Sequence, residues 1–359
     1  FEAGWGGAVW KTLGEDPPVV NVNGPRYSAM HSNDRRVIGF NNIELITDRP
    51  LQVNLDEIRQ IKRDWPDRAL VVSVMLPMNE KAWADHVPMI EDTGADALEL
   101  NFGCPHGMSE RGMGAAVGQV PEYIQMATEG AKAAASIPVI VKLTPNVTNI
   151  LPPAKAAKDG GADAVSLINT LNSIMRVDYD SLTMYPTTDG MGTHGGYCGE
   201  AVKPIALNMV AEIARNEATR SLPISGIGGI TDWRDAVDFL ALGADNVQVC
   251  TAAMTYGFKI VQEMMSGLSD WMDEKGHASV AAVSGKADAE GFLRELGASE
   301  ILTREEMSEK PRPLEGQRWA GAVDVVGTTT LAASTAAART AFRQSSGSAA
   351  RAISSMETP

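Results

Sequence analysis

Along residues 1–275, short apolar runs alternate with longer segments of helical periodicity. The runs have the length of buried β-strands. Seven of them occur, at residues 7–12, 70–75, 97–101, 139–143, 164–168, 223–226 and 246–249. Two apolar stripes predict helix faces that pack on a sheet, and they are formed by Ile205, Met209 and Ile213 and by Val261, Met265, Leu268 and Met272. Pro88 is expected to kink or shorten the helical segment around residues 83–90.

The tripeptide Gly-Ala-Asp occurs at residues 94–96, 161–163 and 243–245, each time between a helical segment and an apolar run. A glycine there is typical of a helix C-cap. The spacing of the copies leaves room for two strand–helix units between them. The pattern therefore predicts an α/β fold, a (β/α)8 TIM barrel. Because only seven strands are found, the first βα unit is expected to be absent.

The pattern changes after Lys275, which sets the predicted domain boundaries. Residues 1–275 form the barrel domain. Residues 276–327 are predicted as a partial α/β segment, with strands near 280–284 and 323–326 and a helix ending at Leu296-Gly297. Residues 328–359 are rich in Ala, Ser and Thr without periodicity, which predicts a disordered low-complexity tail.

Charge and cysteine content exclude several classes of protein. The net charge of −14 argues against a nucleic-acid or anionic-membrane partner. Neither a signal peptide nor an apolar run of about 18 residues, the length of a membrane span, is found. The three cysteines favour a reducing cytoplasm, and they exclude a CxxC zinc site or a four-cysteine iron–sulfur cluster within this chain.

Polar residues stand at the carboxyl ends of several predicted strands. In a βα barrel these ends meet at one mouth, where the active site is built. Two lysines, three asparagines and a cysteine at one mouth are difficult to explain as solvated surface. These residues are Lys11, Lys142, Asn101, Asn146, Asn169 and Cys104, with Thr170 beside them.

The segments at the ends of the last two predicted strands indicate a phosphate-binding site. Residues 225–232 (SGIGGITD) read as a strand, a turn at Gly228-Gly229 and a helix start. Glycines let backbone N–H groups approach an anion, and a helix N-terminus favours negative charge. Residues 248–252 are expected to add N–H donors. A Gly-Gly turn alone is weak evidence of a ligand, but phosphate sites recur after strands 7 and 8 of such barrels.

Cys104 begins a glycine-rich stretch, residues 104–114, which is predicted to be a mobile loop over the mouth. A thiol there is well placed for proton transfer. With an ordinary pKa near 8.5, a thiol is protonated at neutral pH and can act as a general acid. His106 is interpreted as a surface imidazole.

Residues 1–275 resemble the flavin-binding domain of the dihydropyrimidine dehydrogenase family, particularly the catalytic subunit of the bacterial NAD-dependent enzymes, within the dihydroorotate dehydrogenase superfamily. The matching segments are 4–12 (GWGGAVWKT), 39–42 (GFNN), 101–105 (NFGCP), 142–146 (KLTPN), Gly199 with 201–207 (AVKPIAL), and 225–230 (SGIGGI).

The resemblance implies a reaction and a set of site residues. The reaction is reduction of the C5–C6 double bond of uracil or thymine, or its reverse, with FMN as hydride carrier and Cys104 as the general acid. Lys11 and Lys142 would face the flavin ring. The ribityl-phosphate side would be lined by Gly199, Gly228, Gly229, Cys250 and Thr251. The pyrimidine edges would be bound by Asn42, Asn101, Asn169 and Thr170, because an amide offers both a donor and an acceptor. No metal site is implied.

The chain departs from the family at three points. Gly103 stands where the family usually has Ser, the first barrel unit is absent, and no iron–sulfur segment follows the barrel. Electrons from NAD(P)H would therefore arrive indirectly, through a flavin and iron–sulfur partner subunit in an oligomer. Residues 280–327 instead resemble part of an acryloyl-CoA reductase-like medium-chain reductase, on the segments 283–286 (VSGK), 296–302 (LGASEIL) and 319–324 (WAGAVD).

Two alternatives stay open. The first is dihydroorotate dehydrogenase, which shares the barrel, FMN and the asparagines. The second is a non-catalytic product, either a flavin-binding chain or a truncated composite.

Overall fold

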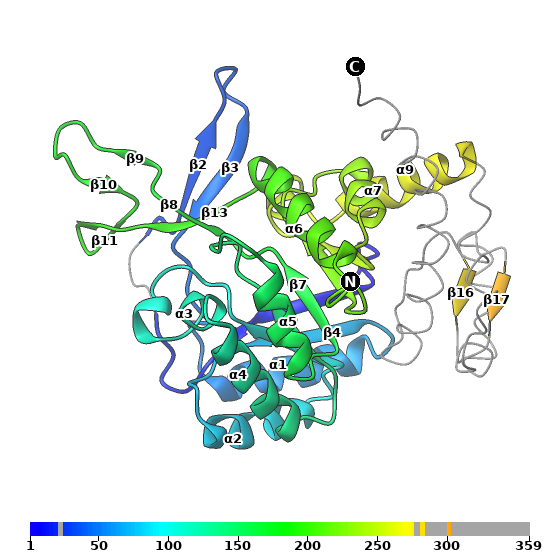
Figure 1. The fold of residues 1–359 in the computed structure, drawn as a ribbon. Coiled ribbons are helices and arrows are strands. Elements are labelled where there is room, and N and C mark those ends of the chain that lie inside the picture. Colours follow the sequence, from blue (N-terminus) through cyan, green and yellow to red (C-terminus); the bar gives the residue numbers. More distant parts are fainter. Residues whose placement is uncertain (21–23, 276–280, 284–299, 303–359) are drawn as a thin grey trace, which may run out of the picture. The chain divides into compact units, whose positions relative to one another are not determined.

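The computed structural model describes residues 1–20, 24–275, 281–283 and 300–302. The chain divides into two compact units, Phe1–Glu263 and Met264–Pro359. The first unit is built on one parallel sheet of seven strands (Figure 1). In spatial order these strands are β1 (Gly7–Leu13), β4 (Ala69–Val74), β5 (Ala97–Asn101), β6 (Val139–Lys142), β7 (Ala164–Leu167), β14 (Ile224–Ile227) and β15 (Asn246–Gln248).

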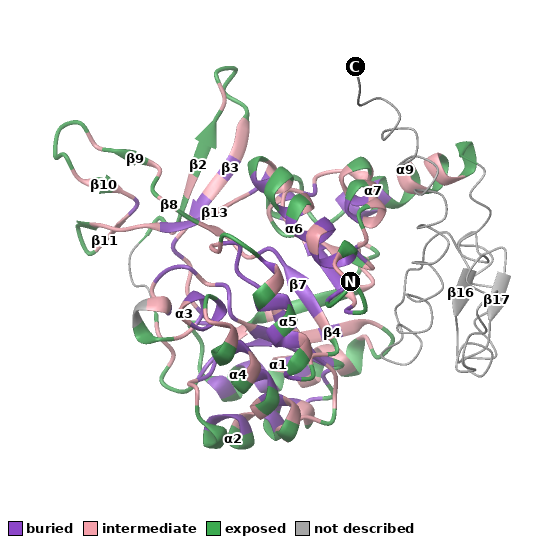
Figure 2. Cartoon of the chain, viewed as in Figure 1, coloured by how far each residue is buried: buried purple, intermediate pink, exposed green. Residues whose placement is uncertain are grey.

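Helices follow most of these strands. They are α1 (Leu51–Asp64), α2 (Glu80–Glu91), α3 (Ala115–Gly118), α4 (Pro121–Ala134), α5 (Leu151–Asp159), α6 (Lys203–Arg215), α7 (Trp233–Ala241) and α8 (Thr251–Tyr256), with 3-10 turns at Ser109–Arg111 and Glu200–Val202. Of these helices, α2, α4, α5, α6 and α7 pack on one another in this order. Figure 2 shows the buried residues gathered on the strands and on the inner faces of these helices. This is the core of the half-barrel.

The sheet is a half-barrel rather than a closed one. Within the described residues, β1 pairs only with β4 and β15 only with β14, so both remain edges. The predicted α/β barrel is confirmed, and each of the seven predicted strands lies within one residue of its observed bounds.

The three Gly-Ala-Asp repeats have one structural role. Gly94, Gly161 and Gly243 adopt left-handed backbone conformations, with φ of 83°, 88° and 107°. The aspartate that follows each glycine accepts a hydrogen bond from the first residues of the preceding strand. The three bonds join Asp96 to Leu70 N (2.7 Å), Asp163 to Val139 N (2.7 Å) and Asp245 to Ile224 N (2.6 Å). Each repeat therefore ties the start of one strand to the start of the next.

An antiparallel sheet lies at the mouth of the half-barrel, and the sequence patterns did not predict it. Its order is β2 (Tyr27–His31), β3 (Val37–Asn42), β13 (Gly195–Cys198) and β8 (Leu171–Ser173). The Tyr197 ring packs directly against Gly39. A Cβ at residue 39 would be 2.5 Å from Tyr197 Oη, so this position favours glycine. Two short pairs extend from this sheet (Figure 1), β9 (Arg176–Val177) with β10 (Met184–Tyr185) and β11 (Thr187–Thr188) with β12 (Met191–Gly192).

Two helix predictions need correction. Pro88 lies on the exposed side of α2, and the helix continues through it to Glu91, so the proline does not shorten it. The apolar stripes are only partly buried. Met209 and Ile213 are buried on α6, but Ile205 is 38% exposed and Met265 is 56% exposed. Apolar residues at helical spacing therefore mark the buried face of α6 only approximately.

The C-terminal part is described more sparsely. Helix α9 (Ile260–Glu274) runs from the first unit into the second. The strand predicted near residues 280–284 is present as β16 (Ala281–Val283), and it pairs in parallel with β17 (Glu300–Leu302). The helix predicted to end at residues 296–297, the strand near 323–326 and the tail 328–359 lie outside the described residues. Among the described helices, none is long and apolar enough to cross a membrane.

Candidate active site

A cavity of about 290 Å³ opens at the carboxyl ends of the barrel strands, beneath β2, β3 and β13. Asn146, one of the three asparagines expected at the mouth, does not line this cavity, and its Nδ2 atom donates to the Thr170 backbone oxygen (3.0 Å) instead. The residues to which the family resemblance gives a role all line it. They are Lys11, Asn42, Asn101, Cys104, Lys142, Asn169, Thr170, Gly199, Gly228, Gly229, Cys250 and Thr251. The prediction that these distant segments converge on one mouth is therefore confirmed. The individual roles assigned to them stay predictions.

Two of the asparagines belong to a hydrogen-bonded chain across the strand ends. Asn169 Nδ2 donates to Asn101 Oδ1 (2.9 Å), and Asn101 Nδ2 donates to Thr12 Oγ1 (3.0 Å). Asn169 Oδ1 in turn accepts from Thr170 N at 2.8 Å. These bonds fix the orientation of both amides, and each amide still has hydrogen-bonding capacity to offer a ligand.

Asn42 enters the cavity from the antiparallel sheet. Its Nδ2 atom donates to the backbone oxygen of Gly196 (3.1 Å), and its Oδ1 atom accepts from Glu44 N (3.3 Å). The oriented amides thus come from two separate sheets, so a flat polar ligand between them would meet hydrogen-bonding groups on more than one edge.

Gly103 separates Asn101 from Cys104 and lies directly under the Asn169 side chain. A Cβ at residue 103 would overlap Cβ, Cγ and Nδ2 of Asn169. The Ser that is usual in the resembling family cannot be accommodated here while Asn169 keeps its bond to Asn101. The departure at Gly103 therefore has a local structural reason.

The two lysines are each held by a carboxylate. Lys11 Nζ lies 2.9 Å from Glu44 Oε2 at the rim, where the Lys11 side chain is 44% exposed. Lys142 Nζ lies deeper, 3.4 Å from Glu99 Oε1, and Glu99 is buried at 1% exposure. Since burial reduces screening, the Lys142 charge acts on the cavity more strongly than the Lys11 charge does.

Cys104 lies on a packed segment. Its thiol donates to the backbone oxygen of His106 (3.3 Å), and its own carbonyl accepts from Ser109 Oγ (2.7 Å) and Ala115 N (3.0 Å). Met108, 1% exposed, anchors the segment in a cluster with Ile46 and Met75. The thiol is thus held in a defined position at the cavity wall.

The burial of His106 contradicts the interpretation from the sequence. The side chain was expected to be a surface imidazole, but it is only 4% exposed, and its Nε2 atom lies 2.9 Å from the backbone oxygen of Glu44. The imidazole joins the Cys104 segment to the strand end that carries Asn42. Its role is to fix the geometry of the cavity wall.

The glycines form a cradle that side chains would fill. Gly199, with φ of 97°, packs so closely on the antiparallel sheet that a Cβ would be 2.9 Å from the Gly39 Cα atom. A Cβ on Gly229, with φ of 74°, would be 3.0 Å from the carbonyl oxygens of Glu200 and Gly199 and 2.7 Å from Lys203 Cβ. Bare backbone at this point fits an anion bound by N–H groups.

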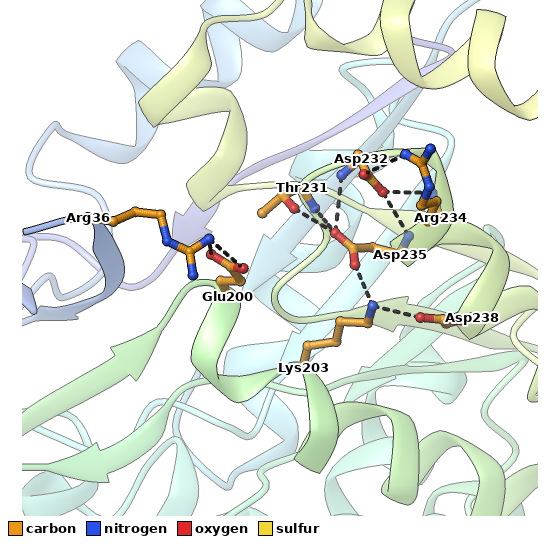
Figure 3. Close-up of polar contacts among 8 residues, drawn as sticks. All are labelled: Arg36, Glu200, Lys203, Thr231, Asp232, Arg234, Asp235 and Asp238. Carbon is orange, nitrogen blue, oxygen red and sulfur yellow. Dashed lines mark hydrogen bonds and ion pairs between the residues drawn. The ribbon is translucent and has the colours of Figure 1, made fainter. Parts of the chain in front are cut away.

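The cations beside this cradle are paired with carboxylates (Figure 3). Arg36 reaches Glu200 at 3.3 Å, and Lys203 bonds Asp235 and Asp238. Asp235 also accepts from the Thr231 backbone N–H (2.7 Å) and hydroxyl (2.6 Å). Lys203 therefore ties the start of α6 to the turn that follows Gly229. Since these cations are paired, an anion in the cradle would be bound by backbone N–H groups.

This ion pair predicts a pH-dependent stability difference. Burial alone would raise the pKa of Asp235, but its bonds from Lys203 and Thr231 lower the pKa below 3.8. Because the folded pKa is depressed, the stabilisation is present above the unfolded pKa and is lost as the pH falls through the folded value. We expect Asp235→Asn to lower the free energy of unfolding by about 1–3 kcal/mol at pH 7, with the deficit shrinking below about pH 3.8.

Urea unfolding at pH 7 and at a series of lower pH values measures this difference. Asp238→Asn is the matched control, since Asp238 bonds the same lysine but is 49% exposed, and its loss should be smaller. A deficit of Asp235→Asn that is equal at pH 7 and at pH 3 contradicts the assignment.

Several cavity residues were missed by sequence reasoning. They include Tyr27, Glu44 and Cys198. Burial, followed by the charge of Glu44, raises the pKa of Tyr27 to about 12, and burial also raises the pKa of the Cys198 thiol. Both therefore stay protonated at neutral pH. The position of Glu44 just after the 39–42 motif could have indicated that it belongs to the site. Tyr27 lies on a strand that no sequence pattern indicated.

The half-barrel and its glycine-lined polar mouth define the protein as a βα-barrel enzyme. The description of the family model that matches residues 11–272 is dihydroorotate dehydrogenase. The chain belongs to this family, whose members are flavin enzymes.

Curated relatives refine the resemblance. The NAD-dependent dihydropyrimidine dehydrogenase subunit PreA of Escherichia coli (strain K12) is 40% identical over 288 residues, which cover 80% of this chain and 69% of that protein. The chloroplastic dihydropyrimidine dehydrogenase (NADP(+)) of Arabidopsis thaliana is 40% identical over 294 residues, covering 79% of this chain and 69% of that protein. The resemblance to dihydropyrimidine dehydrogenases is confirmed.

A solved structure supports the fold. The ligand-free dihydroorotate dehydrogenase of Eimeria tenella superposes with a TM-score of 0.55 at 19% identity, covering 74% of this chain and 76% of that one. At this identity the likeness concerns the fold alone.

Proposed function

We propose that the protein is a flavin-dependent oxidoreductase that reduces the C5–C6 double bond of uracil or thymine, or catalyses the reverse reaction. The observation that carries the proposal is the convergence of oriented amides, a buried lysine, a thiol and a glycine cradle on one cavity. The 40% identity to PreA supports a pyrimidine as the substrate.

FMN fits the residues of this cavity. Gly199, Gly228 and Gly229, with Cys250 and Thr251, would hold the ribityl-phosphate end through backbone groups. Lys11 and Lys142 would face the ring, where positive charge stabilises the reduced form. When bound, FMN supplies hydride exchange between its N5 atom and C6 of the pyrimidine.

The pyrimidine would lie among the oriented amides. Its ring edges present both donors and acceptors, and an amide side chain complements both. Asn42, Asn101 and Asn169 have their orientations set by bonds to the protein, so the ligand does not have to order them. Thr170 completes the set at the end of β7.

Cys104 would be the general acid. Its Sγ proton would pass to C5 of the ring from the face opposite the flavin, and would return to sulfur in the reverse direction. In the absence of substrate the thiol proton is held by the His106 carbonyl. A hydrogen bond to a neutral acceptor leaves the thiol protonated and available.

Electrons would come from NAD(P)H through a partner subunit that carries its own flavin and iron–sulfur centres, in an oligomer. The word "subunit" in the name of PreA supports a multi-chain assembly for that relative. We retain the division into a barrel domain at 1–275, a partial reductase-like segment at 276–327 and a tail at 328–359 as part of the proposal.

Dihydroorotate dehydrogenase is the closest alternative, and a steady-state assay separates the two. Purified protein loaded with FMN is assayed with dihydrouracil and with dihydroorotate, using an artificial electron acceptor. We expect turnover with dihydrouracil and little with dihydroorotate, because the two lysines among the described cavity residues are paired with carboxylates and are assigned to the flavin ring. The reverse preference contradicts the proposed substrate, and a protein that retains no FMN contradicts the proposed function altogether.

A further inference from the structure

Glu99 is a buried carboxylate at the centre of the half-barrel that the proposed reaction does not use. It lies in the middle of β5 with 1% exposure, between Leu98 and Leu100, which are also fully buried. Because side chains alternate along a strand, Glu99 and Asn101 share the face that leads to the cavity. The carboxylate therefore lies one step below the cavity floor.

Side chains from the next two strands of the sheet, β6 and β7, hold this carboxylate. Glu99 Oε1 lies 3.4 Å from Lys142 Nζ on β6, and Glu99 Oε2 accepts from Ser166 Oγ on β7 at 2.8 Å. Lys142 and Ser166 are paired in register, as are Asn101 and Lys142. The three side chains thus form a compact layer beneath the ligand.

Lys142 is the member of this layer that faces the cavity, whereas Glu99 does not line it. Taking a carboxylate out of water costs free energy, which the ion pair and the serine bond offset. An apolar residue would fill the same place without that cost. A negative charge under a cavity-facing lysine reduces the positive potential at the ligand.

We propose that Glu99 is a positioning residue that moderates the charge of Lys142 and so sets the redox potential of the bound flavin. The inference rests on the proposed FMN site. Two-electron reduction adds negative charge to the ring, which Lys142 favours and Glu99 opposes. The pair is shielded from solvent on the Glu99 side, so salt screens it weakly.

The test is the midpoint potential of FMN bound to the full chain, measured against a reference dye. Glu99→Gln keeps the shape and an acceptor for Ser166 but removes the charge. We expect it to increase the preference for reduced over oxidised FMN about tenfold, which is about 30 mV for a two-electron couple. Lys142→Met should shift the potential in the opposite direction. Ser166→Ala leaves both charges in place and should shift the potential much less.

The outcomes distinguish the inference from the proposed function. FMN bound to Glu99→Gln with an unchanged or more negative potential contradicts the role of Glu99 but leaves the function standing. If Glu99→Gln does not fold, Lys142→Met decides, and an unchanged potential there overturns the inference. A wild-type chain that binds no FMN overturns both.

Discussion

Replacing Cys104 with Ala is expected to lower the rate of uracil reduction by about 10²–10⁴-fold, the usual contribution of a general acid. The thiol is held at the cavity wall by its bond to the His106 carbonyl, and its neighbours are packed around Met108. Removing one sulfur atom should leave this wall in place. FMN should therefore remain bound, which the visible absorbance of the purified variant measures alongside turnover.

Cys104→Ser is the matched variant. It keeps an O–H group at the same position, but a hydroxyl is a much weaker acid than a thiol. We expect a rate between those of the wild type and Cys104→Ala. Turnover of Cys104→Ala at the wild-type rate would contradict the acid role.

Gly229→Ala is expected to weaken FMN binding by about 10–100-fold, equivalent to about 1.4–2.8 kcal/mol. The added Cβ would be 2.7 Å from Lys203 Cβ and 3.0 Å from two carbonyl oxygens. Lys203 cannot move freely, because Asp235 and Asp238 hold its ammonium group. The turn would have to shift instead, which would move its N–H groups away from the proposed phosphate position. Titration of the apoprotein with FMN, followed by flavin fluorescence, measures the change.

Gly190→Ala provides a matched control. Gly190 has the same φ of 74°, but a Cβ there meets nothing within 4 Å. Both variants bear a similar backbone strain, of about 1 kcal/mol, and only Gly229→Ala adds a clash. FMN affinity should be unchanged in Gly190→Ala. Equal weakening in the two variants would show that the cradle is not the phosphate site.

The barrel strands were predictable because their signals are local. Each strand is an apolar run. Before three of them, the same Gly-Ala-Asp sequence marks where the helix ends and the strand begins, with the carboxylates at Asp96, Asp163 and Asp245. Asn42 and Gly199, which lie on and beside the antiparallel sheet, were assigned only through the family resemblance. For the residues at the strand ends, convergence followed from one topological rule, that the carboxyl ends of parallel strands meet at one mouth. Neither step required knowledge of tertiary contacts.

The antiparallel sheet was not predictable in the same way. β3 pairs with β13, and these strands are about 150 residues apart in the chain. Their sequences mix glycine with polar residues, since they face the cavity rather than a core. The burial of His106 depends on the same pairing, because the imidazole contacts the Glu44 carbonyl just beyond β3. The buried position of Glu99 was not predictable for another reason. A single carboxylate in the run Ala-Leu-Glu-Leu is also expected on the exposed face of a strand in which polar and apolar residues alternate.

We propose that this cavity brings a flavin and a pyrimidine together with Cys104. A single-turnover experiment tests this, in which FMN-loaded protein is reduced chemically without oxygen and mixed rapidly with uracil. We predict that flavin absorbance returns with a rate that saturates with uracil, and that orotate gives no comparable return. Return of the absorbance with orotate but not uracil, or with neither, would contradict the proposed site.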